Sequence, residues 1–124
     1  PRTVVFERTN IRTAAPADLG APFDVLVADL SFIGLASLAP VFAGLCAPGS
    51  VFIGLVKPQF ESRQGETDDH GLVRDPAVRA RTVREVEQAL AQAGFDVAGV
   101  VESSIRGKRS GNVEYLVRAV FRGA

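Results

Sequence analysis

Two stretches of the chain decide the fold: Val25-Leu26-Val27-Ala28-Asp29-Leu30-Ser31-Phe32 and, about one α/β unit later, Val56-Lys57-Pro58-Gln59-Phe60. In each stretch an apolar run ends in a charged residue, Asp29 in the first and Lys57 in the second. Short apolar runs of this kind are typical of buried parallel strands. Because the carboxyl ends of parallel strands meet at one edge of a sheet, where α/β proteins bind their ligands, we expect Asp29 and Lys57 to lie close together.

A third polar residue belongs to the last strand-like run of the chain. Glu114 opens that run in the stretch Gly111-Asn112-Val113-Glu114-Tyr115-Leu116-Val117. Three segments that are far apart in the sequence can therefore bring an aspartate, a lysine and a glutamate to one site. This spacing is the strongest indication of function in the residues themselves.

The rest of the pattern predicts alternating strands and helices. Apolar runs predict strands at 3–6, 23–28, 51–56, 95–101 and 113–121, and the run at 23–28 is apolar enough to be buried on both faces. Helical spacing predicts a helical turn at 15–20, a helix at 35–46 and a second helix from Pro76, capped by Asp75, to Gly94. Turn residues at 47–50 end the first helix, and 58–76 form a loop long enough to cover a site.

Composition indicates one compact domain or a piece of one. The 124 residues are 47% hydrophobic, and 14 Lys and Arg balance 14 Asp and Glu, so no overall basic field marks a nucleic-acid binder. The single Cys46 excludes an internal disulfide, and no stretch approaches the roughly 18 apolar residues of a membrane span. We therefore expect a cytoplasmic protein. Because the chain starts at Pro1 and enters a strand pattern at once, we expect a fragment of a longer protein.

Five motifs, in order along nearly the whole chain, resemble those of the TlyA haemolysin-type ribosomal RNA methyltransferases. They are Glu7-Arg8-Thr9-Asn10-Ile11-Arg12, Ala28-Asp29-Leu30-Ser31-Phe32-Ile33, Val56-Lys57-Pro58-Gln59-Phe60-Glu61, Gly71-Leu72-Val73-Arg74-Asp75-Pro76 and Gly111-Asn112-Val113-Glu114-Tyr115. Each motif alone is weak, and the ordered set is specific. The resemblance implies an α/β, Rossmann-like S-adenosylmethionine-dependent methyltransferase fold, similar to that of the FtsJ/RrmJ 2′-O-ribose methyltransferases. It also implies methylation of cytidine ribose in ribosomal RNA.

The resemblance also assigns roles to individual residues. Of the family's Lys-Asp-Lys-Glu catalytic tetrad, the Asp, the second Lys and the Glu correspond to Asp29, Lys57 and Glu114. The first Lys and the Gly-rich cofactor loop have no counterpart, so residues 1–124 are expected to be the C-terminal portion of the domain. Asp29 is expected to contact the methionine half of S-adenosylmethionine, and Asn10 its adenosine half. The activity of the shortened chain by itself stays open.

Elementary chemistry agrees with these assignments. A ribose hydroxyl is a poor nucleophile near neutral pH, so an enzyme must orient it toward the methyl donor and offset the developing alkoxide charge. Held between Asp29 and Glu114, the Lys57 ammonium could donate a hydrogen bond to the hydroxyl. If burial favoured its neutral form, the same amine could instead accept the proton.

Each site residue also has a purely structural interpretation. Asp29 can cap a loop or helix, Lys57 can simply leave its strand for solvent, and Glu114 can be an exposed strand residue that pairs with Arg109. Asn10, taken in isolation, is more typical of a turn. The ordered motifs favour function over these interpretations for Asp29, Lys57 and Glu114.

Other residues carry weaker indications. Arg106, Lys108 and Arg109 cluster with no acid among them, and contact with RNA phosphates is weighed equally against a solvated loop. His70 has no second ligand at metal spacing and Cys46 lies in an apolar stretch, so no metal site is predicted. Phe32 and Phe60 follow the two key strand ends and could stack on a base, although core positions are the safer interpretation for all eight Phe.

The fold implied by the resemblance has consequences for partners. A methyltransferase sheet of this type has strand order 3-2-1-4-5-7-6 with the last strand antiparallel. Without its first strands, the strand around Val25 would expose an apolar edge, so we expect self-association. The expected partner is ribosomal RNA or a ribosomal subunit. The alternative function is a noncatalytic RNA- or protein-binding remnant of the fold. Membrane lysis, suggested by the haemolysin name, is disfavoured because no amphipathic basic helix is present.

Overall fold

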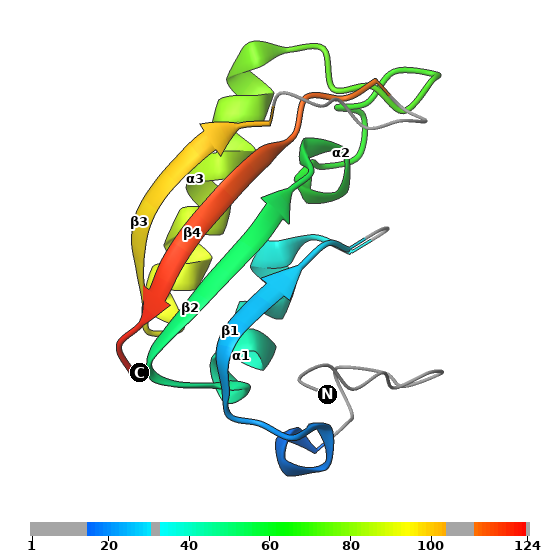
Figure 1. Cartoon of the computed structure of the whole chain (residues 1–124). Coiled ribbons are helices and arrows are strands. Elements are labelled where there is room, and N and C mark those ends of the chain that lie inside the picture. Colours follow the sequence, from blue (N-terminus) through cyan, green and yellow to red (C-terminus); the bar gives the residue numbers. More distant parts are fainter. Residues whose placement is uncertain (1–14, 31–32, 104–110, 124) are drawn as a thin grey trace.

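The computed structural model describes residues 15–30, 33–103 and 111–123, and it folds them into one mixed sheet with helices (Figure 1). In chain order the elements are the 3-10 helix η1 (Pro16–Leu19), β1 (Phe23–Ala28), α1 (Leu35–Gly44), β2 (Cys46–Val56), α2 (Pro58–Glu61), α3 (Pro76–Gln92), β3 (Phe95–Glu102) and β4 (Tyr115–Phe121). The strand expected at 3–6 lies outside the described residues.

The four strands lie in the order β1-β2-β4-β3. β1 and β2 are parallel, whereas β4 runs antiparallel to both of its neighbours, β2 and β3. The last strand of the chain is therefore inserted inside the sheet rather than added at its edge. This arrangement confirms the α/β class and the antiparallel last strand.

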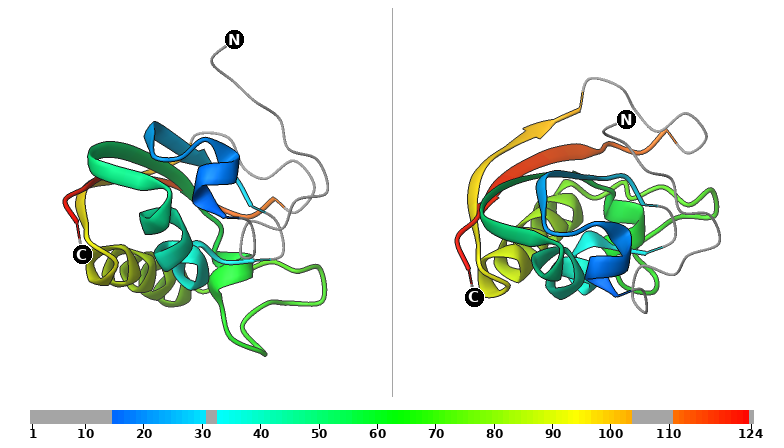
Figure 2. Two further views of the ribbon diagram at one scale, coloured as in Figure 1. Left: turned by 90° about the horizontal axis from the view of Figure 1, so that it is seen from below. Right: turned by 60° about the horizontal axis from the view of Figure 1, so that its bottom comes forward.

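Both long helices cover the same face of the sheet (Figure 2). α1 packs on β2 and on α3, and α3 packs on β3. Fully buried Phe52 of β2 lies in the core between the layers, with its ring centroid 5.0 Å from that of Phe42 and 5.5 Å from that of Phe95. Phe121 extends this chain of rings, 5.1 Å from Phe95. Aromatic contacts thus join α1 to β2, β2 to β3, and β3 to β4.

The other face of the sheet is open in the described part of the molecule. The side chains of Val25 and Val27 in β1 are 58% and 67% exposed, and Val101 and Leu116 are exposed as well. The prediction that 23–28 is buried on both faces is therefore wrong. An apolar run indicates where a strand can be buried, but burial of its second face needs a second layer of helices.

β2 begins earlier than the turn residues predict. Ala47, Pro48, Gly49 and Ser50 lie within its bounds, but the ladder jumps from the pair Phe23–Cys46 to the pair Val25–Val51, so these residues bulge out of the register. The Ser50 hydroxyl accepts a hydrogen bond from the Ala47 N–H at 2.9 Å and donates one to the Phe23 carbonyl at 2.5 Å. The turn residues therefore form a local excursion inside the strand rather than its boundary.

The start of α3 follows the predicted capping chemistry. Asp75 accepts a hydrogen bond from the Ala77 N–H at 2.9 Å, and Pro76 occupies the first helical position. Gly94, with φ 103°, follows the end of the helix as predicted. The expected loop at 58–76 differs at its start, where α2 forms a single helical turn directly after Lys57.

Candidate active site

Asp29 and Lys57 meet at the carboxyl edge of the parallel strands. β1 and β2 pair in parallel up to Ala28 and Gly54, which brings the residues that follow the two strands to the same edge. The Lys57 Nζ atom lies 2.5 Å from the Asp29 Oδ1 atom. The Lys57 side chain is only 13% exposed, whereas that of Asp29 is 61% exposed. Packing of the lysine stem therefore leaves its ammonium group fixed beside an accessible carboxylate.

Glu114 approaches this edge from the far side of β2. β4 pairs antiparallel with β2 and sets Tyr115 opposite Val56, so Glu114 lies beside the end of β2. Its side chain is buried, with 9% exposed. The interpretation of Glu114 as an exposed strand residue is therefore wrong, because Glu114 and the two residues before it, Asn112 and Val113, are all buried.

Among the described residues, Glu114 bonds to Gln59 and not to Lys57. The Gln59 Nε2 atom donates to Glu114 Oε2 at 3.4 Å, while Lys57 pairs with Asp29. The expectation of a lysine held directly between two carboxylates is thus only half met. α2 explains the difference, because Lys57 directly precedes this short helix and Gln59 lies inside it. The Gln59 Oε1 atom is buried and has no hydrogen-bond partner among the described residues.

Two further residues tie the motifs of the site together, and sequence reasoning did not single them out. Glu61, at the end of α2, accepts hydrogen bonds from the backbone N–H groups of Leu35 and Ala36 at the start of α1. Asn112 accepts from the Val73 N–H and donates to the Gly71 carbonyl, each at 2.9 Å. Both residues occur within the quoted motifs, but their partners lie 25 to 41 residues away. No local pattern signals such contacts.

The remaining predicted site residues lie outside the described residues. They are Asn10, expected at the adenosine half of the cofactor, and Arg106, Lys108 and Arg109, expected at RNA phosphates. The aromatic residue Phe32 also lies there, while Phe60 is half-buried in α2. Cys46 is half-buried, and burial raises the pKa of its thiol above the ordinary value.

The loop that follows α2 is fixed by ion pairs. Arg81 of α3 binds Glu66 through both terminal nitrogens, at 2.5 and 2.6 Å, and Asp68 pairs with Arg74. These partners lower the pKa of Glu66 to about 2, mainly through the Arg81 hydrogen bond. The pKa of Asp68 is also lowered to about 2, chiefly by a hydrogen bond from the Leu72 N–H. The loop therefore has a defined course beside the site.

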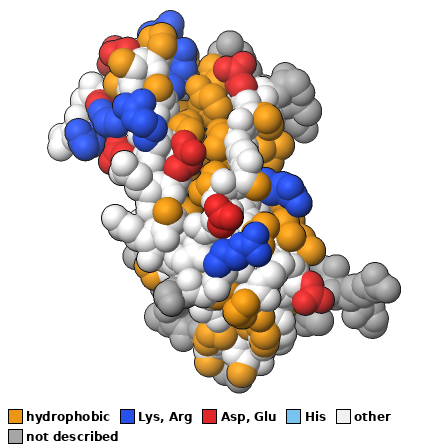
Figure 3. All heavy atoms as spheres, turned by 90° about the vertical axis from the view of Figure 1, so that its left-hand side faces the viewer, with side chains coloured by type: hydrophobic (Ala, Val, Ile, Leu, Met, Phe, Trp, Pro, Cys, Tyr) orange, Lys and Arg blue, Asp and Glu red, His pale blue; other side chains and the backbone are white. Residues whose placement is uncertain are grey.

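The charge on one side of the molecule gives no second candidate site. On the side of the molecule formed by β3 and α3, acidic and basic side chains alternate, and neither sign forms a continuous field (Figure 3). Within 15–30, 33–103 and 111–123, no group of three His, Cys, Asp or Glu side chains could hold a metal ion. None of the helices found in those residues is long and apolar enough to cross a membrane.

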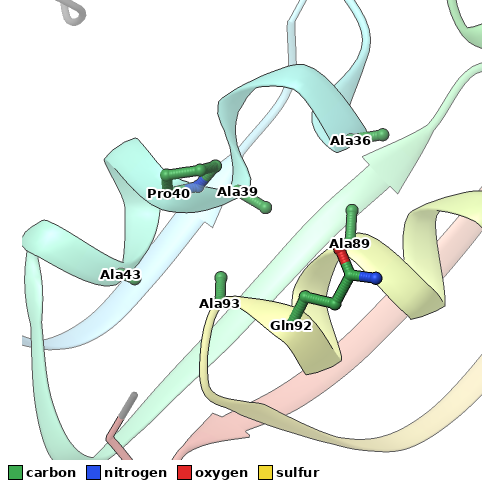
Figure 4. Close-up of a pocket in the computed structure, with 7 residues that line it drawn as sticks. All are labelled: Ala36, Ala39, Pro40, Ala43, Ala89, Gln92 and Ala93. Carbon is green, nitrogen blue, oxygen red and sulfur yellow. The ribbon is translucent and has the colours of Figure 1, made fainter.

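A hollow between α1 and α3 is lined by small side chains. Ala36, Ala39 and Ala43 of α1 face Ala89 and Ala93 of α3, with no titratable group among the lining residues (Figure 4). The alanines let the two helices pack closely, and the hollow offers nothing to move a proton or bind a charge. The carboxyl edge of β1 and β2 therefore remains the candidate active site.

Comparisons with known proteins identify the family of the chain. The FtsJ-like methyltransferase family matches residues 1–121. The chain is 44% identical over 117 residues to the 16S/23S rRNA (cytidine-2'-O)-methyltransferase TlyA of Mycobacterium tuberculosis. The aligned region covers 94% of this chain and 43% of that protein. It is 40% identical over 124 residues to YqxC of Bacillus subtilis, which is named as an rRNA methyltransferase. That aligned region covers 98% of this chain and 43% of YqxC.

A solved structure gives the same result for the fold. The crystal structure of a Lactococcus lactis protein that carries a hemolysin name matches with a TM-score of 0.88 and 35% identity, over 94% of this chain and 56% of that chain. The present chain spans 43% of the length of each of the two curated relatives named above. The resemblance predicted from five motifs is confirmed. With a match that runs from residue 1 to residue 121, the chain belongs to the FtsJ-like methyltransferase family.

Proposed function

We propose that the protein containing this chain transfers a methyl group to the 2′-hydroxyl of a cytidine in ribosomal RNA, with Asp29, Lys57 and Glu114 as its catalytic group. The observation that carries the proposal is the ion pair between the mostly buried Lys57 and Asp29 at the carboxyl edge of the sheet. The Mycobacterium tuberculosis relative is named for this reaction on 16S/23S rRNA. In the same proposal, residues 1–124 are the C-terminal portion of the methyltransferase domain, and the reaction takes place in the cytoplasm.

Membership of a methyltransferase family implies S-adenosylmethionine as the cofactor. When bound, this cofactor supplies an electrophilic methyl group on a sulfonium. The accessible Asp29 carboxylate at a parallel strand end fits a hydrogen-bond donor of the methionine half. Asn10 is the proposed contact for the adenosine half.

Lys57 is proposed to act on the ribose hydroxyl. An ammonium has three donors, and one of them is directed at Asp29, which fixes the direction of the others. A donor placed in advance offsets the alkoxide charge that develops as the hydroxyl oxygen attacks. Glu114 completes the group through Gln59, whose side-chain amide donates to it from α2, the helix that directly follows Lys57. Because Glu114 is buried, its negative charge is screened less than that of a surface carboxylate.

Ribosomal RNA, free or within a subunit, is the proposed partner. Arg106, Lys108 and Arg109 come a few residues before Glu114 in the sequence and would contact RNA phosphates near the site. Lys108→Ala is expected to raise the KM for RNA and to reduce the salt dependence of binding, with kcat little changed. Lys57 and Lys108 are the two lysines of the chain, and the proposal assigns the first to the reaction and the second to RNA binding. Comparing their alanine variants therefore separates an effect on kcat from an effect on KM.

Lys57→Ala tests the catalytic assignment. In the complete gene product, with S-adenosylmethionine and ribosomal RNA saturating, we expect kcat to fall at least about 10³-fold because the charge-stabilising donor is lost. Arg63→Ala removes an exposed cation from the neighbouring loop and serves as the control. Circular dichroism of both variants checks the fold. Near-normal turnover by Lys57→Ala would refute the assignment.

Calorimetric titration of S-adenosylmethionine separates this proposal from a noncatalytic remnant. The titration compares residues 1–124 with the complete gene product. Binding by the complete product alone is expected if residues 1–124 hold only part of the cofactor site. Failure of both to bind would favour an RNA- or protein-binding remnant of the fold.

A further inference from the structure

Glu61 closes the N-terminus of a helix to which it does not belong. Its carboxylate accepts hydrogen bonds from the Leu35 N–H and, at 3.3 Å, from the Ala36 N–H, the first two residues of α1. α1 has no side-chain cap of its own, because Gly34 occupies the capping position and the first turn contains no acidic residue. The carboxylate therefore pairs N–H groups that the helix leaves unsatisfied and meets the positive end of its dipole.

The shape of the contact depends on Gly34. A methyl group added at Gly34 would lie 2.6 Å from the Cδ and 2.8 Å from the Oε2 atom of Glu61. The Gly34 backbone, with φ −79° and ψ 148°, is open to any residue. The missing side chain is therefore required by the carboxylate and not by the backbone conformation.

The same contact connects the two segments of the candidate active site. Asp29 precedes α1 on the segment that leaves β1, and Lys57 directly precedes α2, the four-residue helix that ends at Glu61. Pairing of the parallel strands stops before these residues, at Ala28 and Gly54. Beyond the strand ends, the Asp29–Lys57 ion pair and the Glu61 contact both join the two segments.

We propose that Glu61 is a positioning residue, which caps α1 from α2 and thereby holds the carboxylate of Asp29 and the ammonium of Lys57 at their working distance. Its kinetic consequence rests on the proposed methyl transfer. Its structural consequence does not, since it concerns the ion pair itself. Burial raises the pKa of the Glu61 carboxyl, against the opposing effect of the hydrogen bonds from Leu35 and Ala36. Groups with perturbed pKa values gather at functional sites.

Two carboxylate caps in this chain allow a matched comparison. Glu61→Ala removes the cap of α1, and Asp75→Ala removes the cap of α3, where Asp75 accepts from the Ala77 N–H two residues further along its own helix. Both variants lose a carboxylate at a helix N-terminus. Only the first is expected to disturb the ion pair. Glu61→Gln keeps one acceptor oxygen and is expected to restore part of the function.

Two readouts in the complete gene product distinguish positioning from stability. The first is the rate at which an amine-specific acylating reagent modifies Lys57, measured by peptide mass spectrometry, and it is expected to rise in Glu61→Ala but not in Asp75→Ala. The second is the kinetics of methyl transfer. A displacement of about 1 Å can cost about 10²-fold in rate, so kcat is expected to fall by that order in Glu61→Ala, with KM for RNA little changed.

A double-mutant cycle tests the geometry of the contact. Gly34→Ala should displace the carboxylate and lower kcat in the parent, and it should add little in the Glu61→Ala background, where the obstructing group is gone. If Glu61→Ala does not fold, Gly34→Ala and Glu61→Gln carry the same test.

The outcomes separate this inference from the proposed function. Equal Lys57 labelling in the parent, Glu61→Ala and Asp75→Ala would overturn the positioning role and leave a helix cap only. An additive effect of Gly34→Ala and Glu61→Ala on labelling would also overturn it. A parent protein that transfers no methyl group to ribosomal RNA would overturn the proposed function, while the labelling experiment would still decide the role of Glu61.

Discussion

Phe52 is the residue on which the two layers of the molecule depend. It is fully buried in β2, and its ring contacts those of Phe42 in α1 and Phe95 in β3. We expect Phe52→Ala to lower the free energy of unfolding by about 3–5 kcal/mol, because it removes buried apolar surface and leaves a cavity. Urea denaturation measures the change. Half-buried Phe60 offers the comparison, and a loss for Phe52→Ala no larger than for Phe60→Ala would contradict this account.

Gly54 lets α1 approach the sheet. A methyl group there would lie 2.8 Å from the Leu35 Cδ1 atom and 2.8 Å from the Phe52 ring. Gly54→Ala should therefore destabilise the fold by about 1–3 kcal/mol, as overpacking does. Gly99→Ala in β3 is the matched control, because among the described residues, its two chain neighbours aside, no atom lies within 4 Å of the added methyl. Thermal unfolding of both variants gives the answer, and equal midpoints would contradict the packing argument.

At the residue scale, the sequence predicts contacts between side chains that lie at the ends of strands. The contact of Asp29 with Lys57 follows from two apolar runs that end in charge, because parallel strands place their ends together. The burial of Glu114 and the roles of Gln59, Glu61 and Asn112 depend on partners brought close by the tertiary fold. These contacts have no periodicity for a pattern to detect.

At the scale of elements, α3 is the helix whose start the sequence predicts most directly. Asp75 caps it and Pro76 opens it. We expect Asp75→Ala to cost about 1 kcal/mol, the usual effect of losing an N-terminal cap. Chemical denaturation measures this value, and Asp69→Ala in the preceding loop is the control. A neutral effect of Asp75→Ala would show that the cap seen in the structure contributes nothing in solution.

The loop between α2 and α3 should loosen in acid. The pKa of Glu66 and that of Asp68 are lowered to about 2 in the folded protein, by Arg81 for the first and chiefly by the Leu72 N–H for the second. Because the folded pKa values lie below the ordinary ones of about 4, these groups contribute stability above pH 4 that is lost as the pH falls toward 2. We expect the thermal midpoint to fall across this window, and to fall less in Glu66→Gln. An identical acid profile for the variant would contradict the assignment.

Elements differ in how well local sequence predicts them. The cap and end of α3 were predicted because capping groups bond within a few residues of their own chain. The start of β2 was not, because Pro48 and Gly49 read as a turn while pairing with β1 continues the strand around them as a bulge. Pairing with a neighbouring strand can therefore continue a strand through residues that by themselves favour a turn.

At the scale of the whole molecule, the open face of the sheet sets the expected behaviour of residues 1–124 in solution. Val25 and Val27 expose more than half of their side chains on the edge strand β1. We propose self-association through this strand and expect the sedimentation coefficient to rise with concentration. A Val25→Lys, Val27→Lys variant should be less associated, whereas Ala80→Lys, which adds a charge on α3, should not. A monomeric profile for the unaltered chain at all concentrations would contradict self-association.

The strand order could be predicted only through the resemblance to a family. Apolar runs give strands and their approximate bounds, but they do not say that the last strand lies between β2 and β3. Nor do they reveal the open face, because a valine-rich run looks the same whether one or two layers of helices cover it. Topology and coverage belong to the whole molecule and not to any of its segments.

The central place of β4 has a consequence for how the protein is made. A ribosome synthesises β1, α1 and β2 first, and these can pair as they emerge, but β3 has no partner until residues 115–121 follow it. Sheet closure and delivery of Glu114, which directly precedes β4, therefore come in a single step, once residues 115–121 have been synthesised. A chain interrupted before that step would have neither a finished sheet nor the buried Glu114 carboxylate. Termination before β4 should thus yield material for proteolysis rather than a protein with an assembled site.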